Sequence, residues 1–327
     1  MLKKLTISLT LLVVIFSCSE VPQSSSSAEG VPKNSLLVID EANMYLKSYN
    51  ISSGEVKSLM EIGNAANDIE VDGDYAYVAV SLDNKLLRIN LLSLSKDFID
   101  FAGANPYNLC LDSDRIYLTL SVSNKLAVVS KSTFSVITNI SLVSPGYPMG
   151  VRVDANYVYV ATSDGYPSYG NSRIEIYSKA NYSLITNIAT IHKNPQSLWV
   201  KNGLVYIAAT GTYSSNGGVE RLAVSNFNIE SFATIPSPNP TYIYGFDNYI
   251  CVIESSWGGS GGVYVYNEST ALLTNLLGGI SLKGMEAKDG FLYVSEAYAG
   301  TKTYKINMSD YSVSQIPVGG GDIAIYK

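Results

Sequence analysis

The chain has 327 residues, a formal net charge of −6 and only 15% charged residues. Binding to phosphate backbones needs clustered Lys and Arg side chains, and no such run is present, so nucleic acid is not an expected partner. Tyrosine is abundant at 25 residues, and short aromatic and β-branched segments separated by Gly, Asn and Asp favour strands over helices.

The first residues have the organisation of a secretory signal. Lys3 and Lys4 form a basic start, and an apolar run over residues 5–16 follows. This run is too short to span a bilayer as a helix and is typical of a signal peptide. We therefore expect residues 1–17 to be a signal that directs export.

The residues at the end of this signal resemble the bacterial lipobox. Ile15 and Phe16 lead into Ser17 and Cys18, although Phe16 stands where a small residue is usual. The resemblance implies that Cys18 is lipidated, and Ser19 in place of Asp favours the outer membrane. An ordinary signal peptide with an unmodified Cys18 is the alternative. The polar, serine-rich residues 18–34 predict a flexible tether.

One short block recurs along residues 35–327. Each copy starts at a turn residue and continues as a strand with a central aromatic residue, and the spacing is roughly 40 to 48 residues, the period of one propeller blade. The copies occupy residues 74–80, 114–120, 156–162, 203–209 and 290–296, with a degraded copy at 248–254.

The third repeat shows the content of one unit. Residues 150–154 predict an inner strand, 157–162 a second strand, 173–177 a third and 184–188 an outer strand, with turns between them. The other copies keep this order. The repeating unit is therefore a four-stranded blade.

The two ends of the repeat region complement each other. Residues 322–326 resemble an inner strand with nothing after it, and residues 35–62 resemble three strands with no inner strand before them. Together they make a seventh blade, which would close the ring and remove open sheet edges. The sequence thus predicts an all-β, seven-bladed β-propeller over residues 35–327.

The repeats resemble the YVTN-type propellers of bacteria, which are WD40-like rings. Tyr159-Val160-Ala161-Thr162 comes near the motif that names the family, and residues 129–133 are similar to its turn. The resemblance implies a secreted or surface-exposed propeller and says little about a ligand, because one fold supports many functions. The repeated tyrosines of the block are expected to pack between blades.

Long loops in three successive blades are candidates for recognition. They follow the second strand in blades three to five, at residues 163–172, 210–218 and 255–262, on the face where propeller ligands usually bind. Rigid aromatic residues among Gly, Ser and Asn make good recognition surfaces. The alternative is that these rings pack on neighbouring loops. With Arg152 from the third inner strand, the predicted ligand-binding residues are Arg152, Tyr166, Tyr169, Tyr213, Trp257 and Tyr298.

Acidic residues also recur on the inner strands. Asp68 and Glu70 lie in blade one, Glu286 in blade six and Asp322 in blade seven, and these blades are neighbours in a closed ring. Carboxylate oxygens suit hard cations, so calcium is a candidate cofactor. A water-filled polar channel is the alternative.

Catalytic motifs find little support in the sequence. The single histidine, His192, lies on a loop, where such a residue is usually only polar surface. We therefore hypothesise a monomeric, non-catalytic cell-envelope lipoprotein that binds a glycan or a protein through the loops of blades three to six. The membrane would be contacted through the lipid anchor only. Two alternatives stay open: a metal-dependent hydrolase or lyase that uses the channel carboxylates, and a structural scaffold without a small ligand.

Overall fold

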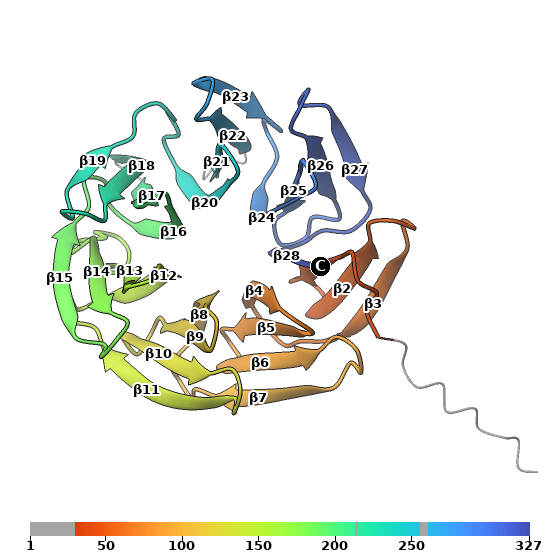
Figure 1. Ribbon diagram of the computed structural model, residues 1–327, viewed down its shortest axis with the longest axis horizontal. Coiled ribbons are helices and arrows are strands. Elements are labelled where there is room, and N and C mark those ends of the chain that lie inside the picture. The colour runs from red at the N-terminus through yellow and green to blue at the C-terminus, as the bar shows by residue number, and fades with distance from the viewer. Residues whose placement is uncertain (1–29, 213–214, 256–260) are drawn as a thin grey trace, which may run out of the picture.

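The computed structural model describes residues 30–212, 215–255 and 261–327. They form seven four-stranded antiparallel sheets arranged as blades around a central channel (Figure 1). The prediction of an all-β, seven-bladed propeller is confirmed. Within the described ranges there is no helix of the length and apolarity needed to cross a membrane.

The inner strands face the channel and are only partly apolar. All six inner strands of blades one to six carry a register shift near their start, which marks a β-bulge. From blade one to blade seven, the inner strands are β4 (Ala66–Asp72), β8 (Pro106–Leu111), β12 (Tyr147–Val153), β16 (Pro195–Lys201), β20 (Pro240–Phe246), β24 (Leu282–Lys288) and β28 (Ile323–Tyr326).

The second and third strands form the buried middle of each blade. Both faces of these strands pack against neighbouring blades, so their sequences are nearly continuous apolar runs. The second strands are β5 (Tyr75–Val80), β9 (Arg115–Leu120), β13 (Tyr157–Ser163), β17 (Leu204–Thr212), β21 (Tyr249–Glu254), β25 (Phe291–Glu296) and β1 (Ser35–Asp40). The third strands are β6 (Lys85–Asn90), β10 (Lys125–Ser130), β14 (Arg173–Ser178), β18 (Ser215–Ala223), β22 (Gly262–Asn267), β26 (Thr303–Asn307) and β2 (Tyr45–Asn50).

The outer strands lie at the rim and are largely exposed to solvent. Their side chains alternate between exposed and half-buried positions. The outer strands are β7 (Lys96–Asp100), β11 (Ser135–Ser141), β15 (Leu184–Ala189), β19 (Ile229–Ser231), β23 (Leu272–Leu276), β27 (Val313–Ile316) and β3 (Val56–Glu61).

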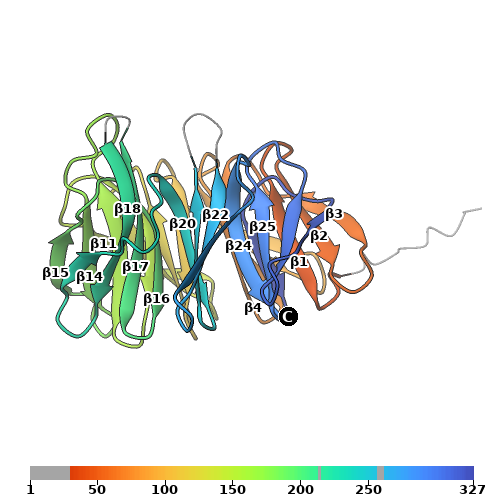
Figure 2. The same cartoon turned by 90° about the horizontal axis from the view of Figure 1, so that it is seen from above.

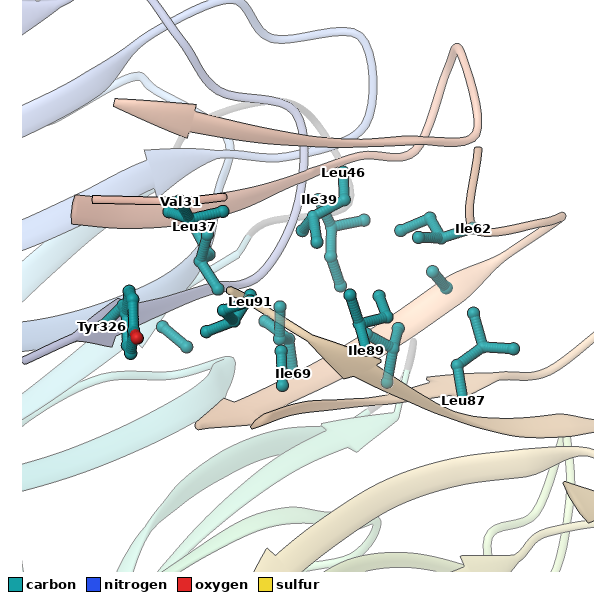
Figure 3. Close-up of a cluster of buried hydrophobic side chains, with 14 of the residues drawn as sticks. Val31, Leu37, Ile39, Leu46, Ile62, Ile69, Leu87, Ile89, Leu91 and Tyr326 are labelled. Carbon is teal, nitrogen blue, oxygen red and sulfur yellow. The ribbon is translucent and has the colours of Figure 1, made fainter. Parts of the chain in front are cut away.

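The ring closes where the two ends of the fold meet. Strand β28 pairs with β1 in antiparallel register, from Ser35 opposite Tyr326 to Val38 opposite Ile323. This is the closure that the sequence predicts. A buried apolar cluster then joins blade seven to blade one, and Figure 3 shows Leu37 and Ile39 of β1 facing Ile89 of β6.

The segment just before β1 also contacts the ring. Val31 is buried in the same cluster, and its backbone N–H donates to the carbonyl oxygen of Leu91. Lys33 pairs with Asp74 and lies over the ring of Tyr326. Residues 31–33, which the sequence places in the tether, are therefore attached to the propeller.

The repeated tyrosines pack between blades as predicted. Tyr77 lies in the apolar cluster of blade two, Tyr117 in a cluster with blade three and Tyr159 in a cluster with blade four. Each is at most 2% exposed. The hydroxyl groups of Tyr117 and Tyr159 donate to Asp112 and Asp154 at the blade end. These side chains hold neighbouring blades together and are not available to a ligand.

We expect Tyr117→Ala to lower the free energy of unfolding by about 3–5 kcal/mol, as for other buried aromatic residues. Tyr117→Phe should cost only about 1 kcal/mol, because Asp112 keeps its contact with Lys179 and two backbone donors. Urea denaturation measures both values. The exposed Leu82, truncated to Ala, is the control. A Tyr117→Ala effect no larger than this control would contradict the packing role.

Candidate functional site

A cavity of about 410 Å³ occupies one end of the central channel. We call it the cup. Its wall comes from the first residues of the inner strands and from the loops that follow the second strands, including the loop of blade three. The aromatic, charged and polar residues of this wall include Asn67, Asp68, Tyr107, Asn108, Tyr169, Gln196, Ser197, Tyr242, Lys283 and Asp322.

The β-bulges explain why consecutive residues line the cup. In a regular strand, neighbouring side chains point to opposite faces, and a bulge re-aims one of them. In β4 the register shifts between Ala66 and Asp68, and both Asn67 and Asp68 line the cup. The same holds for Tyr107 and Asn108 on β8 and for corresponding pairs on β16 and β20.

Proline marks the start of these bulges. Four inner strands carry Pro at their first or second residue, where the channel-side backbone needs no ladder donor. In two of them the preceding residue is Asn in the left-handed region, Asn105 at φ 56° and Asn194 at φ 61°. Asn tolerates this conformation better than most residues. An Asn-Pro pair followed by two polar residues is thus the local signal for a cup-lining pair, and our sequence analysis did not use it.

Four residues of the channel column also fasten their blade to the next: Asp68, Asn108, Ser197 and Asp322. Asp322 Oδ2 accepts the N–H of Ile69 at 3.2 Å, and Asp68 Oδ2 accepts the N–H of Leu109 at 2.6 Å. Asn108 Oδ1 and Ser197 Oγ accept backbone N–H groups of the following blades in the same way. The column of side chains that the sequence places on the channel therefore satisfies exposed edges of the inner strands.

Glycine takes this position where the blades approach most closely. A Cβ on Gly150 would lie 2.8 Å from the carbonyl oxygen of Gln196. A Cβ on Gly284 would lie 2.4 Å from Oδ1 of Asp322. The carboxyl group of Asp322 thus occupies the space that the missing side chain of Gly284 leaves.

Two carboxyl groups meet in the wall of the cup. Asp322 is 2% exposed and Asp68 is 3% exposed. Burial, together with the neighbouring Asp68 carboxyl, raises the pKa of Asp322 well above its usual range. Asp68 also accepts a hydrogen bond from the side-chain amide of Asn108. Asp322 Oδ1 is buried against Gly284, and a protonated Asp322 shares a side-chain hydrogen bond with the Asp68 carboxyl.

The other two predicted carboxylates lie below the cup. Glu70 and Glu286 sit two residues further along their inner strands, and neither lines the cavity. Burial raises the pKa of Glu70 to about 8, and the opposing Arg152 only partly offsets this. Among the described residues no group of three or more His, Cys, Asp or Glu side chains is arranged to hold a metal ion. The geometry gives the expected calcium site no support.

Arg152 belongs to this lower layer. It is buried, and its Nη1 donates to the carbonyl oxygens of Val151 and Leu109. Its guanidinium lies 5.4 Å from the ring of Trp199, which contacts Tyr244 at 4.5 Å between ring centroids. We placed Arg152 among the ligand-binding candidates, but its side chain lies in the layer beneath the cup.

The predicted aromatic residues do not form one surface. Tyr169 lines the cup, and the edge of its ring contacts Tyr166, with 6.4 Å between centroids. Tyr166 and Tyr298 are about two-thirds exposed, at 67% and 65%, and neither lines the cavity. Tyr213 and Trp257 lie outside the described residues. Tyr107 was not among the predicted residues, because it is the bulged residue before the channel column.

The blade-three loop that carries Tyr169 is held by its own hydrogen bonds. The side-chain amide of Asn171 donates to both carboxylate oxygens of Asp164, and Ser172 Oγ donates to the carbonyl oxygen of Tyr169. We expected a long loop over residues 210–218. Most of its described residues instead belong to a hairpin, because β17 and β18 continue and pair Thr212 with Ser215. This hairpin projects from the cup side of the ring (Figure 2).

Buried glutamates fix the loops that enter two inner strands. Glu175 accepts the N–H groups of Val143 and Ser144, just before β12. Glu220 accepts the N–H of His192 at 2.6 Å and contacts its Nδ1 at 3.1 Å, just before β16. His192 is therefore a half-buried partner of Glu220 and not a simple surface residue.

Asp322→Asn provides a test of the carboxyl pair. In the unfolded chain an Asp ionises near pH 4, whereas burial keeps Asp322 protonated to higher pH in the folded protein. Unfolding then releases a proton, so this group reduces stability as pH rises above about 4. Asn cannot ionise and still offers an acceptor to Ile69.

We therefore expect the stability of Asp322→Asn, relative to the natural protein, to increase from pH 4 to pH 8. Urea denaturation at pH 4, 6 and 8 measures the difference. Asp100→Asn, which replaces an exposed residue of β7, is the matched control. A difference that is constant across the three pH values would contradict the shifted titration of Asp322.

Comparisons with known proteins support the fold and do not identify a family or a function. Neither a protein-family model nor a curated protein matches this sequence, so membership of the YVTN-type family stays a prediction. In contrast, 1308 chains of solved structures are similar. A fold shared this widely cannot select one function.

Three of these structures show the range. Hydrazine synthase of Kuenenia stuttgartiensis is 14% identical, with a TM-score of 0.67 over 80% of this chain and 90% of that chain. A streptogramin B lyase is 14% identical, with a TM-score of 0.65 over 80% and 87%. A putative 6-phosphogluconolactonase from Bacteroides uniformis is 12% identical, with a TM-score of 0.65 over 87% and 96%. At these identities the likeness establishes a seven-bladed β-propeller and no activity.

Proposed function

We propose that this protein is a non-catalytic binding module whose cup recognises a glycan. The observation that carries the proposal is the cup itself, a cavity of about 410 Å³ whose wall contains three tyrosines, several amide and hydroxyl side chains, and the charged residues Asp68, Lys283 and Asp322. Small-ligand sites commonly have volumes of about 300–1,000 Å³. The ring fixes the wall rigidly, because cup residues also bond to the neighbouring blades.

The chemistry of the wall suits a polyhydroxylated ligand. Asn67, Asn108 and Gln196 offer both donors and acceptors, which sugar hydroxyl groups need. Tyr107, Tyr169 and Tyr242 offer flat apolar faces with a polar tip.

The metal-dependent hydrolase or lyase is less well supported. The chain has a single histidine, and His192 bonds to Glu220 and does not line the cup. The described carboxylates do not gather into a metal-holding group. Asp68 and Asp322 also serve as hydrogen-bond acceptors between blades, which occupies oxygens that catalysis would need.

A protein partner would use a different surface from the cup. Tyr166 and Tyr298 are exposed on the loops around it and would contact a large partner first. A ligand that enters the cup would instead depend on Tyr107 and Tyr169. The two modes can therefore be separated by mutation.

We expect the double variant Tyr107→Ala and Tyr169→Ala to weaken glycan binding by at least about tenfold. Loss of two aromatic contacts removes more than the 1.4 kcal/mol that corresponds to this factor. A glycan array identifies the ligand, and isothermal titration calorimetry measures its affinity. The matched control is Tyr166→Ala with Tyr298→Ala, which removes two tyrosines outside the cavity.

Equal loss in the control pair would move the site from the cup to the outer loops. Unchanged binding in the Tyr107 and Tyr169 variant would contradict the assignment of the cup. Absence of any glycan ligand, with saturable binding of an envelope protein, would favour the protein partner. Absence of all saturable binding would favour the structural scaffold.

We also infer export and anchoring through Cys18, which lies outside the described residues. The contacts of residues 31–33 with the propeller set the side of the ring from which a tether would leave. Val31 contacts Leu91, and the N–H of Leu91 in turn donates to Asp74 in the turn between β4 and β5, at the end of blade one opposite the cup. A tether from this side would leave the mouth of the cup directed away from the membrane.

Lipidation predicts that labelled palmitate is incorporated into the protein in a bacterial host and that Cys18→Ser abolishes the label. The natural protein should partition with membranes, and the variant should not. Mass spectrometry of the mature N-terminus gives an independent check. A mature protein that starts at an unmodified residue after Cys18 would show an ordinary signal peptide.

A further inference from the structure

The most exposed apolar side chains of the described residues gather at the cup end of the ring. The large apolar side chains that exceed 57% exposure are Leu82, Val122, Val143, Tyr166 and Tyr298. Each lies on a loop that follows a second strand or leads into an inner strand, and these loops lie at the cup end. Single apolar residues are ordinary on a protein surface, whereas a continuous group marks an interaction site.

The loops of blades two and three are bonded to one another. Asn124 lies in the same loop as Val122. Its side-chain amide donates to the carbonyl oxygen of Leu142 at 3.4 Å and to that of Ser144 at 3.1 Å. Leu142 and Ser144 flank Val143 in the chain. Val122 and Val143 therefore belong to one surface.

This surface continues toward blade four. The ring of Tyr147 lies against Gly165, because a Cβ there would be 2.7 Å from the ring atom Cε2, and Tyr166 follows Gly165 directly. The N–H of Thr190 donates to the carbonyl oxygen of Ser172 at 3.0 Å. This bond joins the loop after β13 to the loop before β16. We call the continuous group the rim patch, and its members are Val122, Val143, Tyr147, Tyr166 and Ile191.

Two buried glutamates hold the backbone of the rim patch in place. Glu175 of β14 accepts the N–H of Val143 at 3.1 Å, and Glu220 of β18 accepts the N–H of Ile191 at 3.0 Å. Both glutamates are fully buried. Burial of a carboxylate is costly unless it is hydrogen-bonded, so these loops are held where they satisfy it. An apolar side chain on a fixed backbone loses less conformational entropy when a partner packs on it.

The loops that carry the rim patch have little charge. These loops are residues 121–124, 142–147, 163–172 and 190–194. Their formally charged residues at pH 7 are Asp164 and Lys193, which have opposite signs. Asp164 accepts hydrogen bonds from Asn171, and Lys193 Nζ donates to the carbonyl oxygen of Ser168. The centre of a protein interface is likewise poor in charge and rich in tyrosine.

A protein surface suits the rim patch better than a sugar, a membrane or a second copy. Valine and isoleucine lack the flat face that an aromatic ring offers to a sugar. Attraction to an anionic membrane needs clustered Lys and Arg, and these loops contain Lys193 alone. Residues 31–33 attach at the end opposite the cup. Copies anchored in one membrane through Cys18 would therefore present their patches in the same direction and would not face each other.

We propose that the rim patch docks a protein partner that presents a neutral, apolar surface. The inference goes beyond the proposed glycan function, because no member of the patch lines the cup. Apolar side chains of the partner would pack on Val143, Tyr147 and Ile191, which the structure already holds exposed. Glycan binding and protein docking would thus use separate side chains at the same end of the ring.

Site-specific photo-crosslinking in cells that make the full chain tests the contact. The photoreactive residue p-benzoylphenylalanine replaces Val143, Ile191 or, as the matched control, Leu272. Leu272 is 53% exposed, close to the 52% of Ile191, but lies at the opposite end of its blade. Positions 143 and 191 should give the same adduct, which mass spectrometry identifies as one protein. Position 272 should not give this adduct.

Binding of the purified partner then assigns the contact to the patch. The double variant Val143→Ser and Ile191→Ser should weaken binding by at least about tenfold, because two apolar side chains lose their burial in the interface. Leu272→Ser is the matched control and should leave the affinity unchanged. Tyr107→Ala, which alters the cup, should also leave it unchanged. Isothermal titration calorimetry measures all four proteins.

The alternatives give different results. Adducts at positions 143 and 191 with lipid, or with a second copy of the chain, would overturn the protein partner. Adducts no stronger than at position 272, or an affinity that survives in the double Ser variant, would overturn it as well. Failure of the glycan function has a separate signature, which is the absence of any glycan ligand while the partner still binds and loses affinity in the double Ser variant.

Discussion

Every blade presents an edge strand to the central channel, and this constraint governs the centre of the molecule. The inner strands have backbone N–H groups with no further strand to pair with, and unpaired buried groups are costly. Side chains supply the missing acceptors, because Asp322, Asp68 and Asn108 each accept a backbone N–H from the next blade. Hydroxyl groups of the second strands, such as Thr210 Oγ1, donate to inner-strand carbonyls in return. The ring is thus fastened by polar contacts at its centre and by tyrosines further out.

The same fastening residues form the wall of the cup, so the side chains that join the blades also shape the cavity. Bulges at the start of the inner strands let one residue bond to the next blade while its neighbour faces the cavity. Asp322 shows the cost of this arrangement, because its carboxyl group bonds to the next blade and is buried beside the carboxyl of Asp68, which raises its pKa. Groups with shifted pKa values are concentrated at functional sites in many proteins. The layer of Arg152, Trp199 and Tyr244 lies beneath, outside the cavity lining.

The similarity to many other propellers has a physical reason, and it does not indicate a function. A blade needs only a buried middle, a turn at each end and a period near that of its neighbours, which many sequences satisfy at 12–14% identity. The cup wall depends on one or two positions in each blade, and these are free to differ between propellers. Function must therefore be argued from Asp68, Asp322 and the tyrosines of this chain, and not from the fold.

The sequence alone determined the blades, their number and the closure of the ring, because buried strands require a strict repeat of apolar residues at fixed spacing. It also placed Asp68 and Asp322 on one column and Tyr169 on the long loop that follows the second strand of blade three. Only the tertiary structure decided what those positions do. Tyr107 and Gln196 enter the cup through bulges that alternation cannot reveal, and Arg152, Glu70 and Glu286 fall in the layer below because a shift of two residues changes depth along the channel. The periodicity of the sequence determines which face of the strand a side chain occupies. The position of the bulge and the packing of the neighbouring blades determine which residues that side chain contacts.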